Sequence, residues 1–376
     1  MSACRACGGR PTSGTHRCHR GDVTLPTPPA LQLRPGLRVL PRAHDEIQVG
    51  TDPRWAVRLA GLPADEMLLW AGVDDATDLT TLPPLARRTG ADADAVAATV
   101  VALHRAGLTR ARPPAGATVH GPVAADAAAW ALLRPDTAGD DVVTARADAV
   151  VGVVGLGPTG LGIARHLAVA GVGGLLLDDA APVRSPDVTA GAHRWADVGT
   201  PRAVAARRVL REAAPGVQVD GDGDPDVVVV VEREAADPLR AALLMADAVP
   251  HLSVVVRTAD ALVGPLVRPG TDACLRCLDL HRTEADPRWP TVLEALTRPG
   301  AAARAPGEVG VLAGACAALG AAQVLALLAG ATPSLCGATA ELTLPDLTAR
   351  ERRWHVHPAC GCTAAPGTTD AGPHEG

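Results

Sequence analysis

The chain contains no phenylalanine, tyrosine, lysine or asparagine, and isoleucine occurs only at positions 47 and 163. These five residue types have AT-rich codons, whereas Ala, Gly, Pro, Arg and Val abound, so the bias indicates a gene from a GC-rich bacterium. Without lysine the chain cannot form a Schiff base or clamp a phosphate with an ammonium group. Walker-type and kinase-type nucleotide sites, which depend on lysine, are therefore excluded.

Composition excludes several further classes of protein. With 47% hydrophobic and 20% charged residues among 376, most of the chain is expected to be globular. The net charge of −6 gives no general footprint for nucleic acid. Apolar runs such as 227–231 are too short to span a membrane. No signal-peptide pattern opens the sequence, so we expect a cytoplasmic protein, and its nine cysteines are then expected to be metal ligands or free thiols rather than disulfides.

The two ends of the chain are expected to be disordered tails. Residues 1–30 are rich in Gly, Pro, Thr and Arg and show no apolar period, and residues 363–376 are rich in Gly, Thr and Ala. The first tail holds a Cys-x-x-Cys pair and a later Cys/His cluster, namely Cys4, Cys7, His16, Cys18 and His19. These residues could bind zinc, or the segment could be an unstructured extension or follow a mis-assigned start.

Residues 31–112 form a separate small module. Three short strands are expected at 36–42, 46–50 and 55–62, followed by helices at 63–70, 79–89 and 92–106. This order predicts a winged-helix domain. Because ten arginines face ten acidic residues and the candidate recognition helix begins ADADAV, we expect peptide binding rather than DNA binding. Residues 113–147 are expected to be a linker with one helix.

The segment from residue 148 onward contains a glycine turn between two apolar runs. The strand candidate 149–154 runs into Gly155, Gly157 and Gly160, and a helix is expected at 160–170. A second strand, 175–177, ends at Asp178 and Asp179. Glycines allow backbone N–H groups to approach a phosphate, and a carboxylate after the second strand can bind ribose hydroxyls. The pattern predicts a Rossmann-like α/β domain with a mostly parallel sheet.

Four stretches refine this assignment: GVGGLLLDD, DVGTPRAVAARRVL, VGPLVRPGTDACLRCLDLHR (263–282) and WHVHPACGC (354–362). With them, residues 148–362 resemble the ThiF/MoeB superfamily, whose members activate ubiquitin-like and sulfur-carrier proteins. More narrowly, the chain looks like the ThiF-like partner proteins of YcaO cyclodehydratases. Those proteins join a winged-helix module, which binds a leader peptide, to a ThiF-like domain.

The resemblance implies an adenylation site, and this chain keeps only part of it. The phosphate cradle and the ribose aspartate are present. At the family's other positions the chain has Asp187 for asparagine, Ala190 for arginine and Arg202 for lysine. Where a magnesium-linked aspartate is expected, after 227–231, it has Glu232, Arg233 and Glu234. Arginine keeps the charge of lysine but not its compact reach. Arg202, Asp187 and Glu232 are therefore only weak catalytic candidates, and ATP with Mg²⁺ is a possible ligand.

Two short cysteine pairs lie far apart in the sequence, Cys274/Cys277 and Cys360/Cys362. Two such pairs can form a tetrahedral Cys4 zinc site, and the family places its structural zinc at these positions. The alternatives are free surface thiols, or His355 and His357 as ligands, although HVHP is expected to continue a strand. The remaining cysteines of this region, Cys316 and Cys336, lie in apolar stretches and are expected in the core rather than as nucleophiles.

Residues 309–330 form an apolar helix expected in a core or a dimer interface, and the charged stretch 279–290 is expected to be an exposed crossover loop. The family is usually homodimeric, which implies a homodimer here.

Two functions follow. The favoured one is a non-catalytic platform that binds a peptide or partner for a modifying enzyme such as a YcaO cyclodehydratase. The alternative is an active adenylyltransferase that activates the C-terminus of a ubiquitin-like carrier or peptide with ATP, using Arg202 in place of lysine. A redox enzyme holding NAD on the same turn is weaker, because nothing downstream supplies a hydride-acceptor site.

Overall fold

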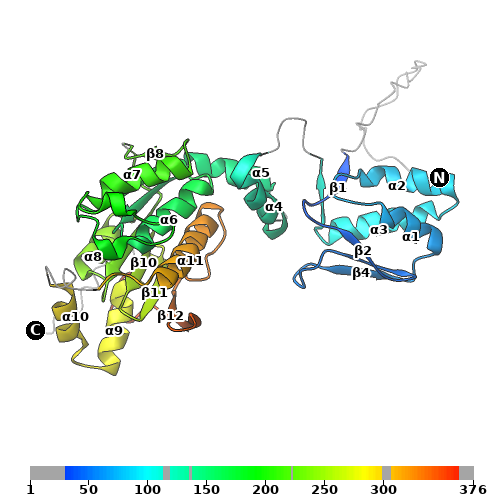
Figure 1. The fold of residues 1–376 in the computed structure, drawn as a ribbon. Coiled ribbons are helices and arrows are strands. Elements are labelled where there is room, and N and C mark those ends of the chain that lie inside the picture. Colours follow the sequence, from blue (N-terminus) through cyan, green and yellow to red (C-terminus); the bar gives the residue numbers. More distant parts are fainter. Residues whose placement is uncertain (1–29, 113–118, 135–137, 222, 299–305, 364–376) are drawn as a thin grey trace, which may run out of the picture. The chain divides into compact units, whose positions relative to one another are not determined.

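The structure is a computed structural model that describes residues 30–112, 119–134, 138–221, 223–298 and 306–363 (Figure 1). The chain divides into two compact units. The smaller one consists of the residues up to Leu33, Val39–Thr51 and Ala56–Arg112, and the larger one contains the rest. The expected terminal tails, with Cys4, Cys7 and Cys18, lie outside the described residues except for their innermost positions.

The smaller unit combines two small antiparallel sheets with three helices. Its strands are β1 (Leu31–Leu33), β2 (Val39–Ala43), β3 (Glu46–Val49), β4 (Val57–Ala60) and β5 (Thr109–Ala111), and its helices are α1 (Ala64–Ala71), α2 (Leu82–Thr89) and α3 (Ala93–Arg105). Strands β2, β3 and β4 pair in that order, and β1 pairs with β5. Asp92 begins α3 by accepting hydrogen bonds from two N–H groups of the first turn. Leu33, Ile47, Trp70 and Leu103 are fully buried in its core.

The larger unit is built on one eight-stranded sheet with the order β13-β12-β11-β10-β9-β6-β7-β8. Its strands are β6 (Val150–Val154), β7 (Gly174–Asp178), β8 (Gln218–Val219), β9 (Val227–Arg233), β10 (His251–Val256), β11 (Asp260–Val267), β12 (Ala338–Thr343) and β13 (Thr348–Arg353). The five strands from β10 to β8 are parallel, whereas β11, β12 and β13 add antiparallel pairs. The valine-rich central strands are buried on both faces, as expected of strands between two helical layers. The predicted Rossmann-like fold is confirmed.

Helices α6 (Pro158–Val169) and α11 (Gly310–Leu328) lie side by side against the sheet (Figure 1). A Cβ on Gly162 would come within 2.7 Å of the Ala317 Cβ, so glycine lets the helices approach closely. By length and composition α11 could cross a membrane. In the structure its inner side, including Leu312, Cys316 and Val324, belongs to the main core, as expected of a core helix.

The stretch expected to be a linker contributes packed helices to the larger unit. They are α4 (Ala124–Leu133) and α5 (Gly139–Ala145). Arg146 follows them with its side chain fully buried, and its guanidinium donates to Asp126 Oδ2 at 2.6 Å and to the Ala170 carbonyl at 3.0 Å. The buried Arg146 thus joins the partly exposed Asp126 of α4 to the end of α6.

The expectation of an exposed loop at 279–290 is wrong. The segment lies mostly in α9 (Leu275–Ala285) and continues into α10 (Trp289–Thr297). Trp289 Nε1 donates to Asp279 Oδ1 at 3.0 Å, and the Arg282 guanidinium lies 5.0 Å from the centroid of the Trp289 ring. The charged residues therefore form a network between two helices. The charged composition of the stretch alone did not distinguish such a network from an exposed loop. The two remaining helices of the sheet layers are α7 (Arg202–Ala213) and α8 (Pro238–Ala246).

Replacing Gly160 by alanine is expected to lower the free energy of unfolding by about 2 kcal/mol or more, because the new Cβ would lie 1.8 Å from the Gly155 carbonyl oxygen. Gly314 is the matched control, since it is also helical and has nothing within 4 Å of its Cβ position. Gly314→Ala should be neutral or stabilising by up to ~1 kcal/mol. Urea unfolding of both variants checks this, and equal effects would contradict the close approach at Gly160.

Candidate functional site

The glycine turn connects β6 to α6 through contacts that only glycine permits. Gly155 has a φ of +81°, and its N–H donates to the Asp178 carbonyl at 2.9 Å. A Cβ on Gly155 would lie 2.2 Å from the Val231 carbonyl oxygen of β9. Together with the contact at Gly160, this geometry joins the turn to both neighbouring strands of the sheet.

The N–H groups of this turn are already hydrogen-bonded to carboxylates of the chain itself. The Leu156 N–H donates to Asp179 Oδ2 at 2.8 Å, and the Thr159 N–H and hydroxyl donate to Glu308 Oε2 at 2.8 and 2.6 Å. Glu308 also lies over Gly157, where a Cβ would come within 2.4 Å of its Oε1. The positive end of α6 favours a carboxylate at this place. The N–H groups of Leu156 and Thr159 are therefore engaged, and the assignment of Gly155, Gly157 and Gly160 to a phosphate cradle stays a prediction.

Arg202, at the start of α7, connects two carboxylates behind the turn. Its Nη1 lies 3.2 Å from Asp179 Oδ2, and its Nε and Nη2 lie 3.1 and 2.8 Å from Asp187 Oδ2. Burial alone would lower the pKa of Arg202, but the two carboxylates outweigh it and raise the pKa. The side chain of Asp187 is only 2% exposed and also accepts the Arg184 N–H. Asp187 is thus neutralised inside the protein.

His193 supports the turn through a hydrogen bond to its backbone, and the sequence did not predict this role. The residue is 1% exposed, and its Nε2 lies 2.7 Å from the Leu156 carbonyl oxygen, to which it donates. Burial lowers the pKa of His193, so the ring is neutral at pH 7. No motif surrounds His193 in the sequence, and its partner lies 37 residues away.

A cavity of about 730 Å³ lies beside the turn, at the carboxyl ends of the parallel strands. Asp178, whose side chain is exposed, Arg202, Glu232 and Arg233 are among the residues that line it. Burial raises the pKa of Glu232, which accepts the Asp237 N–H at 3.1 Å and an Arg240 N–H at 2.8 Å. The fold thus brings the candidate residues 178, 179, 202 and 232 to one place, while the buried Asp187 does not line the cavity. A cavity at this edge of a parallel sheet is suited to a small anionic ligand.

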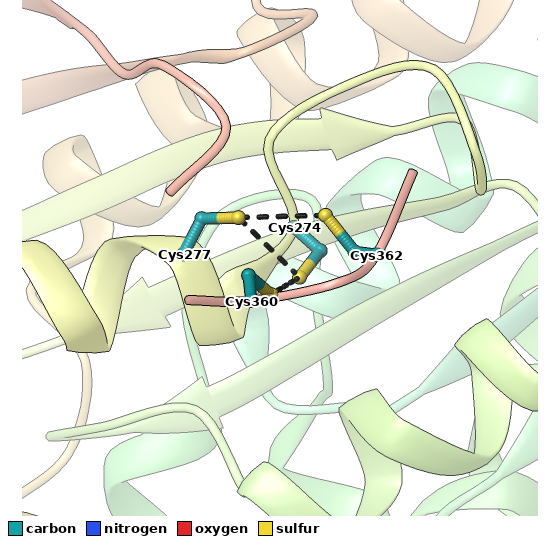
Figure 2. Close-up of side chains that lie close together, drawn as sticks. All are labelled: Cys274, Cys277, Cys360 and Cys362. Carbon is teal, nitrogen blue, oxygen red and sulfur yellow. Dashed lines mark hydrogen bonds between the residues drawn. The ribbon is translucent and has the colours of Figure 1, made fainter. Parts of the chain in front are cut away.

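The four cysteines of the two pairs meet at the start of α9 and the loop after β13 (Figure 2). The sulfur of Cys274 lies 3.9 Å from that of Cys277 and 3.5 Å from that of Cys360, and the sulfur of Cys277 lies 3.4 Å from that of Cys362. A metal ion with four thiolate ligands at ~2.3 Å places its sulfur atoms roughly 3.8 Å apart. The cluster can therefore hold a metal ion.

A second group of possible ligands, His281, Glu284 and His357, lies beside this cluster. His357 Nδ1 accepts the Ala359 N–H at 3.1 Å, so the proton is on Nε2, which donates to Glu284 Oε1 at 2.8 Å. We conclude that this group supports the cysteine loop.

The alternative ligands from the sequence lie outside the cysteine cluster. The expected continuation of a strand through HVHP is wrong, because β13 ends at Arg353. His355 and His357 follow it in a loop, where the His355 carbonyl accepts a hydrogen bond from His281 Nε2 at 3.0 Å and the His357 N–H donates to Cys277 Sγ at 3.3 Å. The backbone of HVHP thus positions the second cysteine pair.

The other two described cysteines lack the features of nucleophiles. Burial raises the pKa of the Cys316 thiol to about 12, and burial with the nearby Asp272 carboxylate raises that of Cys336 to about 11. Thiols with such pKa values hold almost no thiolate at neutral pH.

The sequence itself places the chain in a family. Residues 132–364 match the ThiF family, so the protein belongs to it. Two curated relatives are the vegetative HesA protein of Trichormus variabilis, 30% identical over 230 residues, and HesA of Leptolyngbya boryana, 30% identical over 225 residues. Each match covers 56% of this chain, and 79% and 74% of the respective relative.

Solved structures share the fold over nearly their whole length. Escherichia coli MccB with ATP gives a TM-score of 0.64 at 15% identity, covering 88% of this chain and 99% of MccB. MccB with AMPCPP and MccA gives 0.66 at 13%, covering 89% and 99%. PaaA gives 0.64 at 16%, covering 85% and 99%. At these identities the likeness shows the fold alone.

Asp187→Asn is expected to lower the free energy of unfolding by about 3 kcal/mol, because it removes a buried charge that two Arg202 nitrogens contact. Glu294→Gln is the control, since its ion pair with Arg298 is exposed by 71% and 68% on the two sides and should contribute less than about 0.5 kcal/mol. Denaturant unfolding measures both, and a silent Asp187→Asn would contradict the assigned network.

Proposed function

We propose that this ThiF-family protein binds a peptide or the end of a partner protein and presents it to a modifying enzyme such as a YcaO cyclodehydratase. The observation that carries the proposal is the occupation of the glycine turn by Asp179 and Glu308, which takes up N–H groups that a reacting nucleotide would use. The resemblance to leader-binding partner proteins supplies the kind of ligand and enzyme.

The residues beside the turn fit a reacting Mg²⁺–ATP complex poorly. Transfer of an adenylyl group needs cations that offset the phosphate charge and hold the reacting groups in line. At the end of β9, where a magnesium-linked carboxylate is expected, Glu232 is engaged by Arg240 and the next residue is Arg233. Arg202 is held by two carboxylates behind the turn, and the chain has no lysine.

The smaller unit is the candidate for peptide binding. Its three-stranded sheet has β2 and β4 as edge strands, and an extended peptide can add to such an edge through backbone hydrogen bonds. The order of its strands and helices is consistent with the winged-helix module expected from the sequence. The fold is also that of MccB, whose solved structures include a complex with N-formylated MccA.

An active adenylyltransferase is the second candidate. The cavity of about 730 Å³ and the exposed Asp178 carboxylate beside the turn favour it, as do MccB structures with ATP and AMPCPP. In that case ATP would activate the C-terminus of a ubiquitin-like carrier or peptide, with Arg202 in place of lysine.

Pyrophosphate exchange separates the two candidates. With ATP, Mg²⁺ and either a sulfur-carrier protein or a random-sequence peptide library, we expect no exchange above the protein-free background. The same library passed over the immobilised full chain should yield an enriched peptide sequence. Exchange by the native protein that Gly157→Asp abolishes would establish the enzyme instead. An aspartate at this position would collide with Glu308 and repel it, so the substitution disrupts the turn. No exchange and no enrichment would refute the peptide platform.

We assign zinc to the four-cysteine cluster. Sulfur distances of 3.4 to 3.9 Å fit a tetrahedral thiolate site, which zinc favours and which leaves no open position for catalysis. Bound there, the ion would join the start of α9 to the loop after β13.

The purified protein is expected to contain about one zinc ion per chain. Cys277→Ser should lose most of it and lower the melting temperature, because metal binding contributes directly to folding. Cys336→Ser, at a cysteine outside the cluster, should keep the metal. Elemental analysis with thermal melting measures this, and equal zinc content in the two variants would refute the assignment.

A homodimer and a cytoplasmic location complete the proposal. The paired helices α6 and α11 expose Val169 and Val311, 37% and 63% accessible, which suits an interface between two copies. None of the six described cysteines forms a disulfide, as is usual in a reducing compartment.

A further inference from the structure

Arg233, the last residue of β9, has an unusual environment beside the cavity. Its side chain is only 15% exposed. Although its Nε and Nη2 are buried, they have no hydrogen-bond partner among the described residues. The third nitrogen, Nη1, lies 4.0 Å from Glu308 Oε1, which is an ion pair without a hydrogen bond. A buried guanidinium with unsatisfied N–H groups is costly. The fully buried Arg146 also has its Nε and Nη2 without a partner among the described residues, but of the two only Arg233 lines the cavity, where a ligand can reach it.

The neighbouring arginines show how the chain satisfies this group elsewhere. Arg202 uses the same edge of its guanidinium, Nε and Nη2, to bind Asp187 Oδ2. Arg240 donates to Glu232 at 2.8 Å. Arg233 lines the same cavity but makes no side-chain hydrogen bond to the described residues, so it can turn toward an oxyanion there and gain two.

We propose that Arg233 binds the phosphate of a nucleoside phosphate in this cavity directly, so that the ligand is held without a divalent cation. A guanidinium suits phosphate because its N–H groups match two oxygens and its charge is permanent. The exposed Asp178 beside the turn supplies an acceptor for sugar hydroxyls. A cation at the end of β9 also opposes binding of Mg²⁺ at that wall. The inference goes beyond the peptide platform and takes from it only a non-catalytic site.

A substitution at Glu308 is expected to strengthen phosphate binding, whereas a substitution at Arg233 is expected to weaken it. Its carboxylate lies beside Arg233 and caps α6 through Thr159. A phosphate at Arg233 would be repelled by this charge. A glutamine at position 308 can still accept the Thr159 N–H, but it removes the repulsion.

The experiment measures binding of ATP, ADP, AMP and adenosine to the full chain by calorimetry, in EDTA and in Mg²⁺. For the native protein we expect the same Kd within about twofold in EDTA and Mg²⁺ for the phosphate-bearing ligands. Arg233→Met should weaken their binding by about tenfold to a hundredfold, with adenosine unchanged. Arg233→Lys should fall between the two, and Glu308→Gln should tighten binding by about threefold. Arg211→Met, at an exposed position on α7, is the control, and thermal melting verifies that each variant folds.

Binding that requires Mg²⁺ would overturn the proposal, as would native binding that Arg233→Met leaves unchanged or that Glu308→Gln weakens. The absence of nucleotide binding would also overturn it, and would indicate that ordered water satisfies Arg233. None of these results bears on the peptide platform, which fails only if peptide enrichment is absent or pyrophosphate exchange is present.

Discussion

The hydrogen bonds from the glycine turn to Asp179 and Glu308 determine the character of the site. They connect β7 and the segment before α11 to the start of α6, so three distant parts of the chain meet at the turn. In a dinucleotide-binding Rossmann domain, the N–H groups of this turn approach a phosphate. Here two side chains of the protein supply the negative charge that the helix terminus favours. The fold can therefore be stable around its turn without a nucleotide.

The charges around the cavity follow from this arrangement. Asp179 is shared between the Leu156 N–H and Arg202, and Arg202 in turn neutralises Asp187, which lies too deep to contact a ligand. Asp187, which stands at the family's asparagine position, thus acts as a structural counter-ion of Arg202. Arg233 is the cavity arginine whose hydrogen-bonding capacity is least used among the described contacts.

The resemblance to the ThiF/MoeB superfamily assigned Arg202 and Glu232 to the site, whereas local patterns were enough to predict the parallel part of the sheet, the glycine turn and the place of Asp178 and Asp179 after the second strand. Each depends on an apolar period or on the shared edge of parallel strands. Glu308 and His193 were missed because their partners lie 149 and 37 residues away, and neither residue stands in a recognisable motif. The helices α9 and α10 were missed for another reason. Their charged side chains pair with one another and with Trp289, which composition alone does not distinguish from exposure to solvent.

At both the cysteine cluster and the glycine turn, distant residues of the chain position a local segment through hydrogen bonds. At the cluster, the His357 N–H and the Glu284–His357 pair position the loop that carries two of the four sulfurs, and all four ligand positions come from the chain. At the turn, two carboxylates occupy N–H groups that a ligand could have used. In both places, a hydrogen bond between residues far apart in the sequence holds the local backbone.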